Sequence, residues 1–154
     1  MEGVTSEWRP PAVQRGFALL VSVGFEITAC VSVVEAFAPH GGLSLVPVGL
    51  LMAGCGAFGI RYVVRSCITL TRDTLIVTNT FKRHYVPLNE VTGVSATSAG
   101  LRISRAGQPP LIAAAAQKSR KAVYAGNDMT RADDIASDIL TARSRLESLE
   151  SLNG

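Results

Sequence analysis

Two long apolar runs stand almost back to back near the start of this 154-residue chain. They extend from Phe17 to Val34 and from Leu43 to Ile60, and the second run contains no charged residue. Each is long enough for an α-helix to cross a hydrocarbon core of about 30 Å. Because lipid offers no partners to backbone polar groups, such a segment has to be helical. The sequence therefore predicts a membrane-spanning helical hairpin.

Charged residues are scarce before Arg61 and frequent after it. The polar part that follows the second run is about 90 residues long, which is enough for one compact domain. We therefore expect an N-terminal segment over 1–15, a first spanning helix over 16–38 and an external turn over 39–42. A second spanning helix over 43–64 and a soluble domain over 65–150 complete the expected organisation.

Basic residues lie both before and after the hairpin in the sequence. The turn that connects the two helices contains only His40 as a basic residue. The flanking residues are Arg9, Arg15, Arg61, Arg65 and Arg72. Lys and Arg in short flanking loops favour the cytoplasmic side of a membrane. We expect a multi-pass protein of the plasma membrane, with both termini in the cytoplasm and the turn outside.

A cleaved N-terminus is the alternative to a retained first helix. Basic residues, an apolar stretch and then Ala36-Phe37-Ala38 are typical of a secretory signal peptide and its cleavage site. However, the apolar stretch exceeds the usual length of about 7–15 residues, and Glu26 and Glu35 interrupt it. The retained helix is therefore the favoured interpretation.

Glu26 is an acidic side chain deep inside the first apolar run. Such a group costs about 2.5–3.5 kcal/mol at mid-bilayer, so residues of this kind are often functional. A small transport or channel subunit could act through it. The alternative, which we favour because neither span offers a basic partner, is a protonated Glu26 or one that is hydrogen-bonded to Ser22 inside the hairpin.

Small residues recur in both runs, at four-residue spacing in the second. Those of the second run are Gly49, Ala53 and Ala57, with possible counterparts at Ser22, Gly24, Ala29 and Ser32. Small side chains let helix backbones approach closely in lipid, where packing replaces the hydrophobic effect. The pattern fits a hairpin that packs on itself and equally fits self-association between copies.

From Cys67 onward the pattern changes to short segments in which apolar and polar residues alternate. Such alternation, with Thr and Val enriched, is typical of half-buried β-strands. We expect strands over 68–71, 74–78, 84–87, 91–96, 101–104 and 111–114. Turn signals separate them, which indicates an antiparallel sandwich or barrel. A seventh strand is possible at Ala122 to Tyr124, within a stretch over 117–128 that otherwise reads as loop.

The chain closes with an amphipathic helix. Thr130 and Asp133 have the spacing of a capping box at its start. One face then carries apolar residues at three- and four-residue steps, at Ile135, Ile139, Ala142, Leu146 and Leu149. Because the other faces mix both charge signs, unlike a membrane-surface helix, we expect this one to pack on the sheet.

No motif in the sequence indicates an enzyme, and we expect neither a cofactor nor a metal. The two histidines, His40 and His84, lie too far apart to suggest a nucleophilic triad. No phosphate-binding loop, dinucleotide fingerprint or zinc-protease motif occurs. Asp134 and Asp138 are one turn apart, but without a calcium-binding loop they read as an exposed helix face. No basic, aromatic-interleaved patch suggests nucleic acid.

Four basic residues are the candidates for binding an anionic ligand, above all a lipid headgroup. They are Arg65, Arg72, Lys82 and Arg83. Each basic residue near an anionic leaflet contributes about 1 kcal/mol. Orientation of the hairpin explains the same charges, and a domain tethered by two helices does not need lipids for recruitment. Lipid binding is therefore an alternative hypothesis.

The polar part carries a family resemblance. Its motif positions are Asn79, Phe81, Val86, Pro87, Leu88, Glu90 and Val91. The pattern resembles small bacterial (actinobacterial-type) membrane proteins with two transmembrane helices and a pleckstrin-homology (PH)-like domain. The resemblance covers Arg65 to about Leu149 as well as the hairpin. It departs at Leu88, where an aromatic residue is frequent, and in offering six readable strands where seven are usual.

The resemblance implies a strongly bent antiparallel sheet or barrel, capped by the C-terminal helix. We expect a membrane α-helical hairpin joined to an α+β or all-β soluble domain of this kind. The expected function is a non-enzymatic docking or assembly surface at the cytoplasmic face. Its partners would be the bilayer and an unidentified membrane or cytoplasmic protein, or a second copy, but not nucleic acid. A transport or channel subunit and an anionic-lipid-binding module are the alternatives.

Overall fold

The structure, a computed structural model, describes residues 6–39, 42–118 and 130–153. Its internal contacts divide the chain into two compact units. The helical unit is Pro11–Arg65, and the sheet unit combines Met1–Pro10 with Ser66–Gly154. The helical unit is thus inserted within the sequence of the sheet unit.

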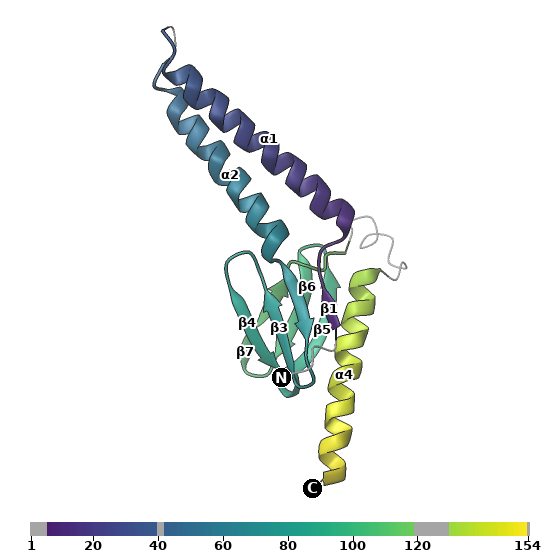
Figure 1. Cartoon of the computed structure of the whole chain (residues 1–154). Coiled ribbons are helices and arrows are strands. Elements are labelled where there is room, and N and C mark those ends of the chain that lie inside the picture. Colours follow the sequence, from purple (N-terminus) through teal and green to yellow (C-terminus); the bar gives the residue numbers. More distant parts are fainter. Residues whose placement is uncertain (1–5, 40–41, 119–129, 154) are drawn as a thin grey trace. The chain divides into compact units, whose positions relative to one another are not determined.

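The helical unit contains α1 (Ala12–Ala36) and α2 (Leu45–Arg65), which form a hairpin (Figure 1). Both helices are long and apolar enough to span a membrane. The helix α1 begins four residues before the expected start, directly after Pro11, whose extended backbone (φ −52°, ψ 146°) precedes the first turn. Pro47 lies in the first turn of α2, where its missing N–H would have had no helical partner.

A narrow line of small side chains joins the two helices. Its fully buried members are Ser22, Ala29, Ser32 and Ala36 of α1 with Gly49 and Gly56 of α2. A Cβ atom placed on Gly49 would lie 3.1 Å from Val33 Cγ2 and 3.2 Å from the Ala29 carbonyl oxygen. One placed on Gly59 would collide with the Ser22 hydroxyl. Glycine therefore permits the close approach of the backbones.

The expected four-residue stripe on the second span is only partly right. Gly49 is buried, but Ala53 is half-buried and Ala57 is exposed. The buried glycines, Gly49 and Gly56, are instead seven residues apart. Two helices packed at a small angle meet again every two turns, which is a seven-residue step, so a strict four-residue row drifts out of the contact.

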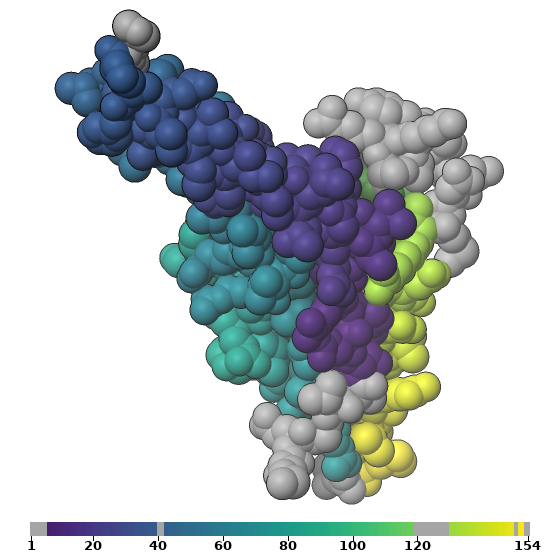
Figure 2. Space-filling model, turned by 45° about the horizontal axis from the view of Figure 1, so that its top comes forward, coloured from purple at the N-terminus to yellow at the C-terminus, as the bar shows by residue number. Residues whose placement is uncertain are grey.

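The outer surface of the helix pair is apolar. The most apolar part of each helix has only 17% of its residues buried in α1 and 11% in α2. Among the large exposed side chains are Val13, Phe17, Leu20, Ile27, Val34, Leu50, Leu51 and Val64. Figure 2 shows the outward face of α1, in purple to blue. A core helix of a water-soluble protein would be covered instead, so this distribution supports membrane insertion.

The close approach at Gly49 predicts the effect of a bulky side chain. We expect Gly49→Leu to destabilise the helix pair by about 1–3 kcal/mol, because the added atoms meet Val33 and the α1 backbone. Gly54→Leu is the matched control, since a Cβ there meets nothing within 4 Å. Titration of the full chain from mild detergent into SDS measures both. Equal midpoints for the two variants would contradict the described interface.

The sheet unit has two antiparallel sheets. The first has the order β1 (Ser6–Trp8), β2 (Cys67–Leu70), β3 (Thr74–Thr78) and β4 (Arg83–Pro87). A 3₁₀ turn, η1 (Leu88–Glu90), leads to the second, with the order β5 (Val91–Thr97), β6 (Gly100–Arg105) and β7 (Gln108–Ala113). The helix α4 (Arg131–Asn153) packs on β5, β6 and η1 (Figure 1).

All six expected strands are present within three residues of their predicted bounds, but the expected barrel is not closed. Pro87 and η1 separate the first sheet from the second, so β4 and β5 do not continue one ladder. Among the described residues the seventh strand is β1, which pairs with β2 so that Trp8 lies opposite Ile68. The alternative at Ala122 to Tyr124 falls outside the described residues.

One hydrophobic core lies between the sheets and α4. Its largest fully buried side chains are Ile68, Leu75, Val77, Val86, Leu88, Val91, Leu101, Ile103 and Ile139. Leu88 of η1 is thus part of this core. The apolar face of α4 is buried as expected through Ile135 and Ile139, whereas Leu149 near its end is 46% exposed. The last turns of α4 therefore contribute little to the core.

Asn79 joins the two sheets. Its side-chain Nδ2 donates to the Ile112 carbonyl oxygen at 2.8 Å, and its Oδ1 accepts from the Ala114 N–H at 3.1 Å. The turn between β3 and β4 is therefore hydrogen-bonded to the outer edge of β7, in the way that a residue of a neighbouring strand would be.

Candidate functional site

The candidate basic residues do not form one cluster. Arg72 lies in the turn before β3, whereas Lys82 and Arg83 follow the turn after it, with Arg83 opposite Thr78. The five residues of β3 span about 17 Å, so these groups lie at opposite ends of the strand. Arg65 belongs to the helical unit as the last residue of α2. All four residues are exposed.

Two of these residues have identifiable neighbours. The Arg83 guanidinium lies 5.2 Å from the centre of the Tyr85 ring, a cation–π distance. Arg72 lines a cavity of about 190 Å³, together with Arg145 on α4. Leu146 and Leu149 supply the apolar wall of this cavity. The geometry therefore does not bring Arg72 and Arg83 together into one anion site.

Glu26 lies in the contact between α1 and α2, against Gly56. A Cβ atom on Gly56 would be 2.5 Å from Glu26 Oε1, so the glycine provides the space for the carboxylate. The Ser22 hydroxyl donates to the Ala18 carbonyl oxygen at 2.7 Å, so the expected bond from Ser22 to Glu26 is wrong. Within the described residues, the Glu26 carboxylate has no hydrogen bond and no ion pair.

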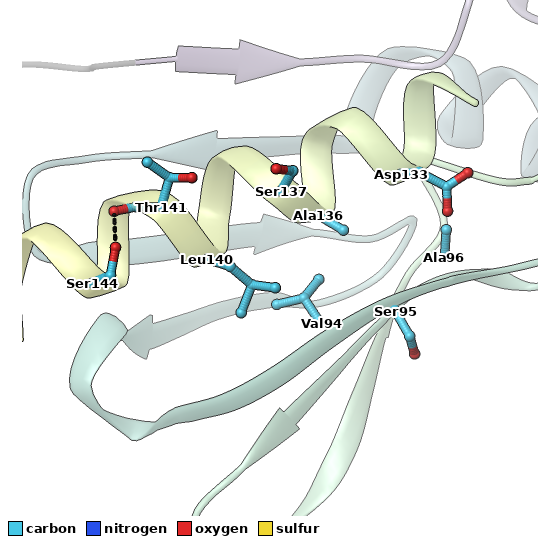
Figure 3. Close-up of a pocket in the computed structure, with 9 residues that line it drawn as sticks. All are labelled: Val94, Ser95, Ala96, Asp133, Ala136, Ser137, Leu140, Thr141 and Ser144. Atoms are coloured by element: carbon cyan, nitrogen blue, oxygen red, sulfur yellow. Dashed lines mark hydrogen bonds between the residues drawn. The ribbon is translucent and has the colours of Figure 1, made fainter. Parts of the chain in front are cut away.

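A groove between β5 and α4 was not anticipated from the sequence. It has a volume of about 610 Å³ and lies open to solvent along one side. In Figure 3, Val94 of β5 and Leu140 of α4 point toward one another across it, whereas Ser95 points away. Ala96 and Ala136 complete the apolar floor.

Hydroxyl groups line the α4 side of this groove, and a single acidic residue closes one end. The hydroxyl residues are Ser137, Thr141 and Ser144, and Ser144 donates to the Thr141 carbonyl oxygen at 2.9 Å. The acidic residue is Asp133. The sequence signal that could have identified the groove is a β5 strand without charge or bulk, next to a helix face rich in hydroxyls.

Asp133 forms one half of the expected capping box, in which its carboxylate accepts from the backbone N–H of Thr130. Its Oδ2 accepts from the Thr130 hydroxyl at 2.7 Å and from the Thr130 N–H at 2.9 Å. Lys118 Nζ lies 3.1 Å from the same oxygen. These contacts, the Thr130 hydrogen bonds first and then Lys118, hold the pKa of Asp133 below its ordinary value of 3.8. The carboxylate is therefore already paired when it borders the groove.

Among the described residues, no group of three or more His, Cys, Asp and Glu side chains is arranged to hold a metal ion. Asp134 and Asp138 are exposed on α4. Comparison of the chain with protein-family models, with curated proteins and with solved structures found no match.

The capping box predicts a pH dependence of stability. Asp133→Ala is expected to destabilise the sheet unit by about 1 kcal/mol at pH 7, because the first turn of α4 loses its cap. The pKa of Asp133 is lowered by folding, so this stabilisation is present above pH 3.8 and is lost as the pH falls through the folded-state pKa. The difference between wild type and variant should therefore shrink below pH 3.8.

Urea titration of the full chain in detergent measures this effect through Trp8, the single tryptophan, which packs against the sheet core. Asp138→Ala on the exposed face of α4 is the matched control and should leave the midpoint unchanged. A difference between Asp133→Ala and wild type that stays constant from pH 7 to pH 3 contradicts the proposed role of the carboxylate.

Proposed function

We propose that this chain is a membrane-anchored, non-enzymatic docking or assembly module with a PH-like domain at the cytoplasmic face of the plasma membrane. The observation that carries the proposal is the pairing of β1 with β2. Strand β1 (Ser6–Trp8) precedes the hairpin in the sequence, and strand β2 (Cys67–Leu70) follows it. Backbone hydrogen bonds cannot form across a bilayer, so both ends of the hairpin belong to one compartment.

The register identifies the end of the sheet from which both helices leave. Trp8 pairs with Ile68, Cys67 with Thr78, and Thr78 with Arg83, so these residues share that end. Arg83 and its neighbour Lys82 are exposed there. Positive charge beside the membrane ends of a hairpin favours the cytoplasmic side. The basic residues therefore support a cytoplasmic sheet unit more directly than they support an anion site.

Strand β1 also bears on the cleaved alternative. Processing at Ala36-Phe37-Ala38 would remove Ser6–Trp8 and leave β2 without its outer neighbour. It would also remove Trp8 from the side chains that pack against the core. These losses favour a retained first helix, and hence an anchored rather than a secreted domain.

The PH-like assignment is supported by the number of strands. The described residues form seven strands and a terminal helix, as the resemblance implies, with β1 as the seventh strand, whereas the two separate sheets differ from the single bent sheet or barrel that it implies. Docking is supported by the open groove beside β5, which is the larger of the two cavities described above. One domain shape serves many roles, so the partner has to be found at this surface rather than inferred from the fold.

A transport or channel subunit is the second candidate. The observation that favours it is the Glu26 carboxylate in the helix contact, without a hydrogen-bond or ion-pair partner in the described part of the chain. Such a group in a spanning segment is expensive to maintain. Anionic-lipid binding remains a weaker alternative, since Arg72 and Arg83 are separated by the length of β3.

The sidedness is tested by reporters fused in turn to Met1 and to Gly154. We expect both to be active only in the cytoplasm, because β1 and β2 pair in one compartment. Intact-mass measurement of the membrane-extracted chain should show the full sequence. Reporters active on opposite faces, or a chain that begins near Pro39, would contradict the proposal.

The docking role is tested by cross-linking the full chain in native membranes and identifying the captured proteins. Docking predicts that Glu26→Gln leaves the captured set unchanged, because the hairpin serves as an anchor. Replacing the sheet unit while keeping the hairpin should abolish capture. Capture that follows the hairpin and is lost in Glu26→Gln would instead favour the transport candidate.

A further inference from the structure

The smaller of the two cavities lies between the turn that follows β2 and the helix α4, and its volume is about 190 Å³. Its apolar walls come from Leu70 at the end of β2 and from Ala142, Leu146 and Leu149 of α4. Leu70 is buried, whereas Leu149 is 46% exposed. The last turns of α4 therefore present apolar surface at this cavity that the core of the sheet unit does not cover.

Two arginine side chains, Arg72 and Arg145, line the same cavity. Neither guanidinium forms a hydrogen bond or an ion pair with any other residue in the part of the chain that the structure describes. A guanidinium presents a planar fork of N–H donors that matches the oxygens of an anion. Two such groups beside one cavity favour an anionic ligand.

The other polar side chains of this turn already have partners. The Thr71 hydroxyl accepts from the Thr74 N–H at 3.1 Å and donates to the Thr74 carbonyl oxygen at 2.8 Å. Asp73 Oδ1 accepts from the Thr74 hydroxyl at 3.2 Å. Because the Asp73 carboxylate offsets one of the two arginine charges, a ligand with a single negative charge matches this site better than a dianion does.

The volume of the cavity limits the size of the apolar part of the ligand. An apolar cavity of about 150 Å³ is large enough for a benzene molecule. Cavities that bind larger organic ligands usually measure about 300–1,000 Å³. A cavity of about 190 Å³ therefore suits a single ring or a short branched chain.

The cavity lies at the end of the first sheet that is remote from the ends of the hairpin helices. Cys67, Thr78 and Arg83 share the end from which the helices leave. Leu70 pairs with Leu75 at the opposite end, next to the turn that carries Arg72. We therefore expect the ligand to come from the aqueous phase rather than from the bilayer beside the hairpin.

We infer that this cavity binds a small organic monocarboxylate, whose apolar part is a single ring or a short branched chain. The carboxylate accepts hydrogen bonds from Arg72 and Arg145, and the apolar part covers Leu146 and Leu149. Binding joins the turn before β3 to α4, and it stabilises the sheet unit because only the folded chain brings these residues together. The inference goes beyond the proposed docking function and does not depend on it.

The experiment uses the full chain in lipid nanodiscs and para-fluorobenzoate as the probe, followed by fluorine NMR. We expect a saturable change in the probe signal that empty nanodiscs do not produce. The neutral para-fluorobenzyl alcohol has the same ring but no charge, and it should bind at least about tenfold more weakly. Acetate, which lacks the ring, and phenyl phosphate, which is a dianion, should each compete less well than benzoate.

Two variants test the arginines. Arg72→Gln and Arg145→Gln should each weaken the binding of para-fluorobenzoate by about tenfold, because each removes one guanidinium from the cavity. Arg102→Gln is the matched control, since Arg102 is exposed on β6 and does not line the cavity. It should bind the probe as the wild type does.

The apolar wall is tested by Leu149→Ser, which should also weaken binding. Leu152→Ser is its matched control, because this 81% exposed position on the same helix is not part of the lining. The urea midpoint, followed through Trp8, shows whether each variant is folded.

Three results would overturn the inference. They are a neutral alcohol that binds as tightly as the carboxylate, two arginine variants that bind as the wild type does, and phenyl phosphate that competes better than benzoate. The comparisons between ligands use the wild-type protein, so they stand even if a variant fails to fold. Failure of these tests would leave the docking function intact, because cross-linking in native membranes measures that function separately.

Discussion

The pairing of β1 with β2 is the interaction on which the architecture depends. It joins the segment before the hairpin to the segment after it, across 58 residues that contain the compact helical unit. Packing of Trp8 against the sheet core adds to the backbone hydrogen bonds of this three-residue strand. The hydrogen bonds between β1 and β2 and the packing of the core therefore stabilise each other. The sheet unit is complete only when the residues before the hairpin and the residues after it are both present.

Local patterns were sufficient to predict much of this fold. The two apolar helices, six strands with their alternation, and the Thr130–Asp133 cap each depend on neighbours in the sequence, and each is present. Strand β1 was missed because three residues carry no measurable period, and its partner lies beyond the hairpin. Asn79 forms hydrogen bonds with Ile112 and Ala114. These bonds were missed for the same reason, because a side-chain hydrogen bond between two sheets leaves no local pattern in the sequence.

The candidate sites also divide into residues that the local sequence identifies and contacts that only the fold reveals. Glu26 lies in the contact between the helices, but its neighbour Gly56 was not anticipated, because the contact repeats every seven residues rather than every four. Arg72 and Arg83 are close enough in the sequence to suggest one patch, yet β3 separates them. The lining of the groove beside β5 contains one charged residue, Asp133, and its two walls come from distant parts of the sequence, so the weak signal in each wall was overlooked.

The position of the hairpin within the sheet also has a consequence for biosynthesis. Residues 6–8 are synthesised before both helices, but the strand they pair with is made only after them. Domains generally fold as units during translation, and this unit cannot be completed before the residues after the hairpin have been made. The first strand therefore stays unpaired until both helices and the strand that follows them have been synthesised.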